Sequence, residues 1–542
     1  MTQRIAEDLI QRRRRLADAR RGWETHWQEL AEMLLPQRAD FLPSRTAGGK
    51  RTEQQFDSVP LQAVRALAAS IDGLLKPKSS RWFGLKADDP DLDGDDDVKA
   101  WLEHVEDRLY AALHEPRSRF AQRTAEVELD LVVFGTGCLY VGERPSRGGI
   151  TFRSHHLRNI LAAENADGEI DTVFRSFTLS ARQAVEQFGA DQVGRTVKAA
   201  LAQGDVDRLF RFLHVIQPRP DFDPRRADAR ALPFASIYVD EESICVVAEG
   251  GYQEFPYVVP RWETAADEIY GRSPGMLALP DVKTLNQMGK TILRAGHKVV
   301  DPPLLVPDDG ITAGPRTYPG GITSYDASIL RHLGGRSPII PLETGANIPL
   351  GREMQNDVRE QVWSAFFRNV LQLPVPGPQM TATEILERKE EFLRVIGPTF
   401  GRLEAEYTAP LIERVFNVLL RAGRFAPMPD VLRGRRLRFE YASPVAKAQR
   451  RIEAAALRKT LDDVGPLLNA HPDLLDHLDH EQILKDIASA NGVPARWFRA
   501  RCEVEWQRRE RGPDSTEAGP AALRSIERLI DLGRHVGGAT GP

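Results

Sequence analysis

The segments PDVKTLNQMGKTILRAGHKVV (280–300) and REMQNDVREQVWSAFFRNVL (352–371) predict two helices that pack side by side as a hairpin. In the first segment, apolar residues recur at helical spacing on one broad side, and Asp281 is the only acidic residue. We expect this helix to begin in the turn after Pro280, because the first turn of a helix needs no backbone N–H. The second segment repeats the apolar spacing around Val362. At about 1.5 Å per residue, each helix would be about 30 Å long.

A stripe of positive charge lies opposite the apolar side of the first predicted helix, at about 100° per residue. Its members are Lys283, Lys290, Arg294, His297 and Lys298. Surface helices usually carry charges of both signs. The stripe therefore indicates either a face directed at a polyanion or a plain solvated face, and the helix alone leaves both interpretations open.

The segments around the hairpin have a different character. Residues 301–350 contain eight prolines and lose helical periodicity, which predicts short strands and turns. A proline-rich loop spans 372–380, and the capping box Thr381–Glu384 then begins a long helix that reaches Gly423. We expect bends in that helix at Gly397–Pro398 and at Pro410, where a backbone hydrogen bond is lost.

Several runs of this sequence together resemble one protein family. They are YGRSPGMLALPDVKTLNQ (270–287), DPPLLVPDDG (301–310), MTATEILERKEEF (380–392), FEYASPVAKAQR (439–450), WETHWQELAEMLLP (23–36) and FDSVPLQAVRALAASIDGLL (56–75). The likeness is to the portal, or head-to-tail connector, of short-tailed bacteriophages and related prophages. It covers roughly residues 1–450 in order, which is far more specific than a single short motif.

The resemblance implies an α+β, predominantly helical portal fold that assembles as a closed ring, usually of twelve subunits, around a central channel. It also divides the chain into the parts of that fold: 1–270 and 381–445 as wing, 271–300 and 351–371 as stem, 301–350 as clip, 372–380 as channel loop, 446–510 as a helical crown, and 511–542 as a flexible tail.

The same resemblance implies a structural role rather than catalysis, with no cofactor and no metal. The ring would sit at one capsid vertex of the virion, after assembly in the host cytoplasm, and conduct double-stranded DNA during packaging and ejection. Its implied partners are the large terminase subunit, then tail adaptor or nozzle proteins, together with capsid and scaffolding proteins, and no membrane.

Candidate residues follow for each role. The DNA-channel candidates are Lys283, Lys290, Arg294, Lys298, Gln372 and Gln379. The clip candidates for motor and tail docking are Arg316, Tyr318, Tyr325, Arg331 and Arg336. The stem-packing candidates are Val282, Ile292, Val362 and Phe366. If the basic stripe faces the bore, charge reversal at Lys290 and Arg294 should impair packaging without dissolving the ring.

Composition is compatible with this prediction. The chain has 542 residues, of which 42% are hydrophobic, and 73 basic residues against 77 acidic ones give a formal net charge of −4. A sequence-independent DNA clamp normally needs a basic surplus, whereas a balanced channel lets a duplex slide. Cys138, Cys245 and Cys502 lie far apart, which favours a reducing compartment without a disulfide framework.

Two other function classes remain as alternatives. The segment Gly271–Gly275 (GRSPG) matches the GxSxG elbow of serine hydrolases, but Pro274 follows the serine and has no N–H for an oxyanion hole. The second alternative is a nucleic-acid-binding scaffold that forms no ring. The sequence has no GxxxxGK[ST] phosphate loop, so we expect no ATP hydrolysis by this chain.

Two patterns resemble metal sites, but each lacks a required ligand. The turn Asp89–Gly94 begins like a calcium loop, but Ala100 stands where a bidentate glutamate is required. His477 and His480 have neighbouring aspartates but no well-spaced third ligand. We expect a solvated loop and a polar helix edge instead, and a structural role for His155 and His156.

Elsewhere the pattern predicts α+β structure without a βαβ rhythm, so no doubly wound nucleotide fold is expected. The predicted helices are 1–35, 60–75, 98–113, 119–133, 181–188 and 191–202, and the predicted strands are 81–85, 138–142, 150–154, 244–251, 257–262 and 437–441. No apolar run approaches the length of a membrane span.

Overall fold

The structure is a computed structural model that describes residues 2–42, 49–77, 81–89, 92, 95–144, 149–305, 340–341, 347–368, 397–435 and 437–441. The chain forms two compact units. The first comprises 1–86, 101–433 and 437–443, and the second comprises 87–100, 434–436 and 444–542. The elements discussed below belong to the first unit, apart from the ends of β1 and α3 that enter the second.

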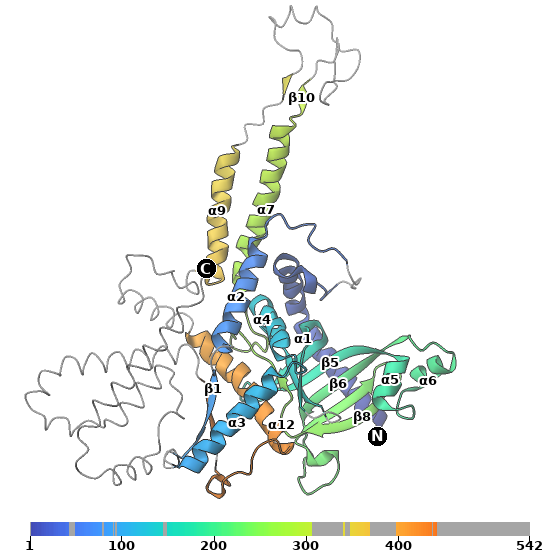
Figure 1. The fold of residues 1–542 in the computed structure, drawn as a ribbon. Helices are drawn as coiled ribbons and strands as arrows, with labels where there is room; N and C mark the ends of the chain where they lie inside the picture. Colours follow the sequence, from blue (N-terminus) through green and yellow to red (C-terminus); the bar gives the residue numbers. More distant parts are fainter. Residues whose placement is uncertain are drawn as a thin grey trace, which may run out of the picture. The chain divides into compact units, whose positions relative to one another are not determined.

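The first unit is built around a group of helices (Figure 1). They are α1 (Thr2–Leu34), α2 (Val59–Leu75), α3 (Asp96–His114) and α4 (Phe120–Phe134). Helix α4 is central, because α1, α2 and α7 (Pro274–Val300) all pack against it. Its side chains from Val127 to Phe134 are almost entirely buried, and the indole of Trp27 donates a 3.1 Å hydrogen bond to the carbonyl of Phe134. These four helices confirm the predicted ones to within about two residues at each end.

A five-stranded antiparallel sheet lies beside these helices, in the order β4-β5-β6-β7-β8. Its strands are β4 (Ile160–Glu164), β5 (Ile170–Ser180), β6 (Leu209–Pro218), β7 (Phe234–Asp240) and β8 (Cys245–Tyr252). The sequence predicted only the last of these strands. The antiparallel pairing agrees with the expectation that no doubly wound fold is present.

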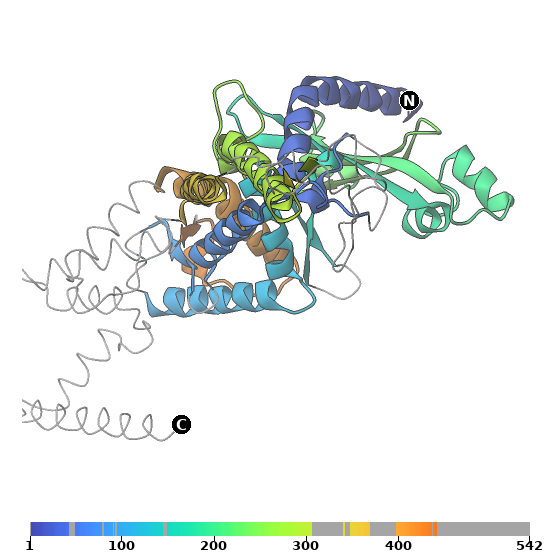
Figure 2. The ribbon, with the colours of Figure 1, turned by 90° about the horizontal axis from the view of Figure 1, so that it is seen from above.

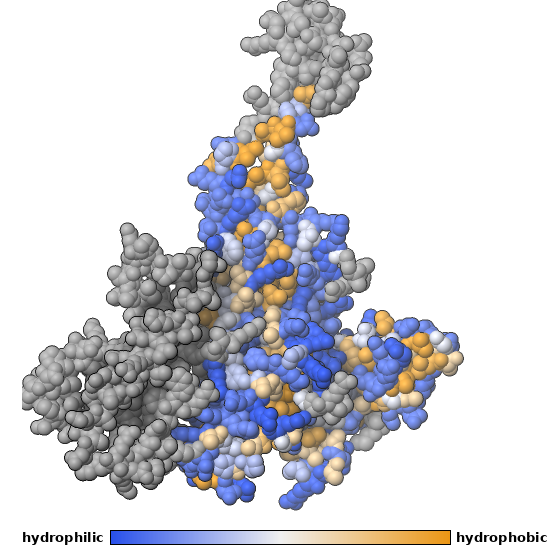
Figure 3. Space-filling view, in the orientation of Figure 1, coloured by the Kyte–Doolittle hydropathy of each residue, from blue (hydrophilic) through white to orange (hydrophobic). Residues whose placement is uncertain are grey.

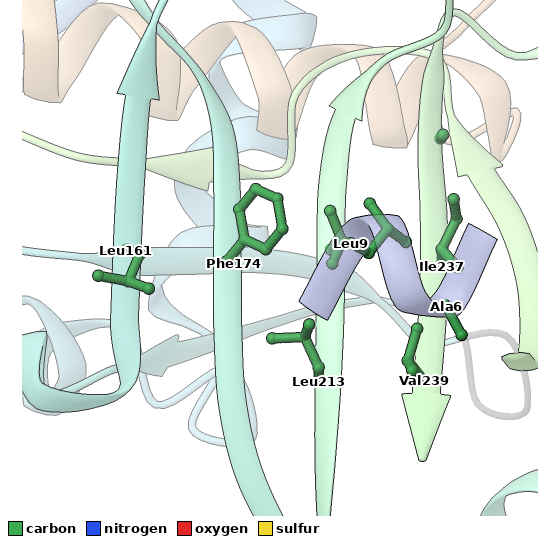
Figure 4. Packing of buried hydrophobic residues seen from close by; sticks show 9 residues of the cluster. Ala6, Leu9, Leu161, Phe174, Leu213, Ile237 and Val239 are labelled. Atoms are coloured by element: carbon green, nitrogen blue, oxygen red, sulfur yellow. The ribbon is translucent and has the colours of Figure 1, made fainter. Parts of the chain in front are cut away.

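Both faces of this sheet are covered by helices of the same chain. Along β6, successive side chains point to opposite faces. Leu213 packs under the N-terminal half of α1, where it meets Ala6 and Leu9 (Figure 4). Phe212 faces the other way, into a cluster with the short helices α5 (Ala181–Phe188) and α6 (Arg195–Ala202). The sheet is therefore buried on both sides by its own chain.

The remaining elements are small. A three-stranded sheet has the order β3-β2-β9, and β1 pairs with β12. The bounds are β1 (Phe83–Ala87), β2 (Leu139–Glu143), β3 (Ile150–Ser154), β9 (Tyr257–Val258) and β12 (Leu437–Tyr441), with short 3₁₀ turns η1 (Pro36–Arg38), η3 (Leu157–Asn159), η4 (Ala229–Ala231) and η6 (Asp430–Leu432). All five strands overlap predicted ones, although β9 is much shorter than the predicted segment 257–262.

Helices α7 and α9 (Ile348–Ala365) lie side by side in both ribbon views and form the predicted hairpin, which we call the stem pair (Figures 1 and 2). The expected start of α7 after Pro280 is wrong. The helix begins at Pro274, because Ser273 caps it by accepting the N–H of Met276, and Pro280 lies inside the helix. Helix α9 also starts earlier than predicted, with Asn347 as its cap. Beyond α7, β10 (Leu304–Leu305) pairs antiparallel with β11 (Ile340–Pro341).

A wide helical turn precedes Pro410, where the sequence predicted a bend. A π-helical turn, η5 (Glu404–Thr408), precedes α12 (Ala409–Arg421), and the N–H of Ala409 bonds to the carbonyl of Glu404 five residues back. Proline has no N–H to donate and its ring crowds the preceding turn. The wider spacing of the π turn accommodates both properties of Pro410 without ending the helical path.

Candidate functional site

The base of the stem pair is fixed to the end of α4. Ser273 Oγ donates a 2.8 Å hydrogen bond to the carbonyl of Val133 and accepts the N–H of Met276 at 3.0 Å. At the same junction Gly135 has φ 77°, and a Cβ on it would lie 2.2 Å from the carbonyl oxygen of Gly271, so only glycine fits there. The serine of the GRSPG segment is thus a buried helix cap, which gives no support to the hydrolase alternative.

A second anchor holds both helices of the stem pair on one side. The N–H of Phe56 donates to Asn286 Oδ1 at 2.8 Å, and Asn286 Nδ2 donates to the carbonyl of Gln54 at 2.9 Å. On α9, Arg359 and Gln355 donate to Asp57 at 2.9 and 3.1 Å. The segment 54–57 therefore clamps α7 to α9 near the middle of the two helices.

The basic stripe of α7 divides into two halves. Lys283 forms an ion pair with Glu29 of α1, and the Lys290 ammonium lies 5.7 Å from the ring centroid of Phe56. Arg294 and Lys298, farther along the helix, are exposed and make no ion pair within the described part of the chain. Lys283 and Lys290 thus contact other parts of the same chain, whereas Arg294 and Lys298 pair with no acidic group of the described residues.

An acidic stripe on α9 was not predicted. Glu353, Asp357 and Glu360 are exposed, and no ion pair joins them to another described residue. At about 100° per residue they lie opposite the buried Val362, just as the basic stripe lies opposite the α9-facing side of α7. Their spacing of four and three residues was a readable signal in the sequence. The stem pair therefore has a basic edge on α7 and an acidic edge on α9.

Three of the four predicted stem-packing residues, Val282, Val362 and Phe366, are fully buried within the protomer. Ile292 is half-buried, and it lies beside Gly351 of α9. Packing of these residues between subunits stays a prediction. The channel candidates Gln372 and Gln379 lie outside the described residues, as do all five clip candidates.

Buried charges join the π turn to the helical core. Lys76, just after α2, forms an ion pair with Glu128 of α4, and its ammonium lies 3.3 Å from the hydroxyl of Tyr407 in η5. Burial raises the pKa of Glu128 to about 7, and the positive charge of Lys76 opposes that rise. Both charged side chains are almost inaccessible, so removal of either partner would leave the other charge buried and unpaired.

A second ionic contact leaves the same π turn in another direction. Glu406 accepts hydrogen bonds from the Arg261 guanidinium at 2.9 and 3.0 Å, and Arg261 also pairs with Glu164 at the end of β4. Farther along the chain, Arg414 and Arg421 of α12 both pair with Glu254. The helical segment 397–421 is thus attached to the sheets and to the core by separate charged clusters.

The structure tests only part of the metal and histidine predictions. Among the described residues, no group of three or more His, Cys, Asp or Glu side chains could hold a metal ion. His155 is buried, which lowers its pKa to about 3, and His156 accepts the N–H of Arg158 to cap a short turn. The calcium-like turn is only partly described, and His477 and His480 lie outside the described residues. No described helix is both long enough and apolar enough to cross a membrane.

The model of one protein family, the bacteriophage head to tail connecting proteins, matches residues 6–498. The chain belongs to this family. A probable portal protein of Bordetella phage BPP-1 is 30% identical over 526 residues, which cover 95% of this chain and 92% of the relative. The portal protein of Salmonella phage epsilon15 is 29% identical over 542 residues, covering 98% and 96%. A solved chain from the virion of a native gene transfer agent particle aligns with a TM-score of 0.35 and 11% identity, over 80% of this chain and 94% of that one.

Family membership confirms three predictions made from the sequence: the head-to-tail connector family, the α+β portal fold and a structural portal role. The family is a structural one, and its members connect the phage head to the tail.

Proposed function

We propose that this chain is the protomer of a closed ring at the head-to-tail connection of a bacteriophage virion, through which double-stranded DNA enters and leaves the head. The observation that carries the proposal is the family match over residues 6–498. By resemblance the ring has twelve subunits. Its parts would be the wing, stem, clip, channel loop, crown and tail with the boundaries predicted from the sequence.

In this proposal the protein performs no chemical step. Its work is to hold partners and to leave a passage, so its surfaces rather than any catalytic residue determine function. Ring assembly takes place in the host cytoplasm, with capsid and scaffolding proteins. The clip, 301–350, meets the large terminase subunit while the head fills and tail adaptor or nozzle proteins afterwards. A closed ring requires that each subunit use two different surfaces toward its two neighbours.

We further propose that the basic edge of the stem pair faces the bore. Arg294 and Lys298 are its strongest candidates, because both are exposed and neither is paired with a described residue. Repeated around a ring, these two residues would give a local positive belt in a protein whose net charge is only −4. Such a belt attracts a duplex without the many phosphate contacts that would hold it in place. Lys283 and Lys290 contribute less, since they already contact Glu29 and Phe56.

Electron microscopy of the purified protein, with its mass in solution, tests the ring. Rings with a central hole wide enough for a duplex are expected. A uniform species of 60.6 kDa at every concentration would contradict the proposal.

The bore assignment has its own test, in which Arg294 and Lys298 are both changed to Glu and packaged DNA per particle is measured. Rings that assemble but package less DNA are expected, and unchanged packaging would remove these residues from the bore.

A further inference from the structure

The stem pair has two flanks in addition to its two charged edges. We call the flank that contacts segment 54–57 the near flank, because Asn286 of α7 and Arg359 of α9 both reach that segment from it. The opposite side is the far flank. Segment 54–57 covers the near flank as far as about Lys290, so the outer half of the stem pair, beyond Lys290, depends on its own residues.

Helical spacing assigns the outer residues to flanks. Residues seven and fourteen positions apart share a helix face, at about 100° per residue. Leu293 and Val300 follow Asn286 at these spacings, so they lie on the near flank. The far flank combines Val299 of α7 with Leu350 and Met354 of α9. Both flanks of the outer stem are therefore apolar.

These five side chains are large and accessible. Their exposed fractions are 51% for Leu293, 53% for Val299, 86% for Val300, 52% for Leu350 and 52% for Met354. Figure 3 shows hydrophobic residues gathered on the outer stem between hydrophilic borders. Scattered apolar residues on a surface need no explanation, but a contiguous set indicates an interaction site. Because both flanks carry such a set, a partner on one side would leave the other side exposed.

The charges beside the flanks are complementary. Arg352 lies seven residues before Arg359 and so belongs to the near flank, where His297 of α7 also borders it. Asp357 borders the far flank, about one turn of α9 from Met354. All three side chains are exposed. One flank therefore combines apolar groups with positive charge, and the other combines apolar groups with negative charge.

We propose that the far flank of one stem pair docks on the near flank of the next copy of this chain. This inference rests on the proposed ring and specifies its subunit interface. Two different, mutually complementary surfaces on opposite sides of one element are what a closed ring requires. The contact would bury Leu293 of one copy against Leu350 of its neighbour, and it leaves the basic and acidic edges uncovered on the two walls of the ring.

The heights of the two leucines support this contact. Gly351 packs beside Ile292, and Gly289 lies beside Gln355, so the antiparallel helices run in a fixed register. In that register Leu350 lies within about one residue of the level of Leu293, a difference of about 1.5 Å. Neighbouring copies related by rotation about a shared axis keep equal heights. Leu293 and Leu350 of adjacent subunits can therefore meet without a sliding displacement.

Disulfide cross-linking tests the arrangement. The native cysteines are first replaced (Cys138→Ala, Cys245→Ser, Cys502→Ser), and microscopy establishes that this background forms rings. Leu293→Cys and Leu350→Cys are then combined in one chain and oxidised. A ladder of covalent oligomers that extends to the whole ring is expected, while each single variant should give at most a trace of dimer. A double variant without cross-links, in a preparation that contains rings, would overturn the proposal.

A matched pair of cysteines distinguishes the competing arrangement, in which the basic edge of one copy meets the acidic edge of the next. Lys290→Cys combined with Glu353→Cys lies at equal height in the same register, but on the two edges. No ladder is expected from this pair, and a ladder here would overturn the flank contact.

If the cysteine-free background forms no rings while the unaltered protein does, the same test is made in the unaltered protein. If the unaltered protein itself forms none, the proposed function fails first.

A substitution experiment gives an independent measurement. Leu293→Glu places a charge in the proposed interface, and we expect most of the protein to remain unassembled by mass in solution. Leu209→Glu is the control, since Leu209 is 63% exposed at the start of β6, away from the stem. It should leave assembly unchanged. Both leucines are exposed in the protomer, so neither change should unfold it, and circular dichroism verifies this. Normal rings from Leu293→Glu would contradict the proposal.

Discussion

The five-stranded sheet and the stem pair differ in what completes them. The sheet is covered by α1 on one face and by α5 and α6 on the other, so its apolar residues are buried by the same chain. The outer stem is a two-helix element with exposed apolar side chains on both flanks and opposite charges on its edges. The sheet is thus complete within one chain, whereas the outer stem carries the surfaces that the proposed neighbouring copy would cover.

The largest expected effect separates the two regions directly. Phe212→Ala removes a fully buried ring from the sheet and should lower the free energy of unfolding of the protomer by about 3–5 kcal/mol. Leu293→Ala in the stem should change it by less than about 0.5 kcal/mol, because the side chain is already exposed. Urea unfolding of the unassembled protomer measures both. Equal losses of unfolding free energy would mean that Leu293 is packed within the protomer as tightly as Phe212.

Glu128 should make the stability of the helical core around α4 depend on pH. Its pKa is raised to about 7 in the folded chain, above the ordinary value near 4.5, so the folded state binds the proton more tightly. This contribution to stability is fully present below about pH 4.5 and is lost as the pH rises through about 7, by about 1–3 kcal/mol in total.

Glu128→Gln tests this pH dependence, because the amide does not titrate. The variant should lose that part of the slope of the unfolding free energy between pH 4.5 and 7. Changing the exposed Glu353 of the stem to Gln is the control, and it should leave the slope as it was. A slope that survives in Glu128→Gln would assign the effect to another group.

The junction between the two regions should show a smaller effect. Ser273→Ala removes the cap of α7 and the hydrogen bond to Val133, and it should lower the free energy of unfolding by about 1–2 kcal/mol. Ser273→Thr keeps a hydroxyl cap and should recover part of the loss. Chemical denaturation with both variants provides the measurement. An unchanged midpoint for the alanine variant would show that the stem base is held by other contacts.

The smallest effect is expected within the basic stripe. Lys283→Ala breaks the pair with Glu29, in which both side chains are more than 40% exposed, and should cost the protomer less than about 0.5 kcal/mol. Arg294→Ala, with no described partner, should change protomer stability even less. Differential scanning calorimetry in low and high salt can resolve the pair, since salt weakens it. A larger loss for Arg294→Ala would point to a contact within the protomer.

Long periodic helices such as α2 and α4 could be predicted because one chain segment carries their whole pattern. Strands β4 to β7 could not. A sheet buried on both faces replaces the alternation of apolar and polar residues with nearly continuous apolar runs, and β6 (LFRFLHVIQP) is such a run. The start of α7 was missed because a proline signal at 280 was followed in place of the serine cap at 273.

The candidate site was predictable only where its pattern lies within a single helix. The basic stripe lies within one helix and was visible in its spacing. The pairing of Lys283 with Glu29 joins residues from distant parts of the sequence, and helical spacing contains no information about such a contact. The acidic edge of α9 was as readable as the basic one. Its place as one edge of the stem pair becomes clear only when α7 is known to pack on the opposite side of α9.

The π turn at 404–408 also has a consequence for the history of the sequence. A π turn contains one residue more than the α-helical path that it replaces. Deleting a single residue there would restore ordinary α-helix and leave α12 in nearly the same orientation, because the π turn absorbs the extra residue. Arg414 and Arg421 would still face Glu254, but Pro410 would lose the wide turn that accommodates its ring and its missing N–H. Relatives that lack the extra residue should therefore also lack a proline at this position, even where they keep the two arginines and their glutamate.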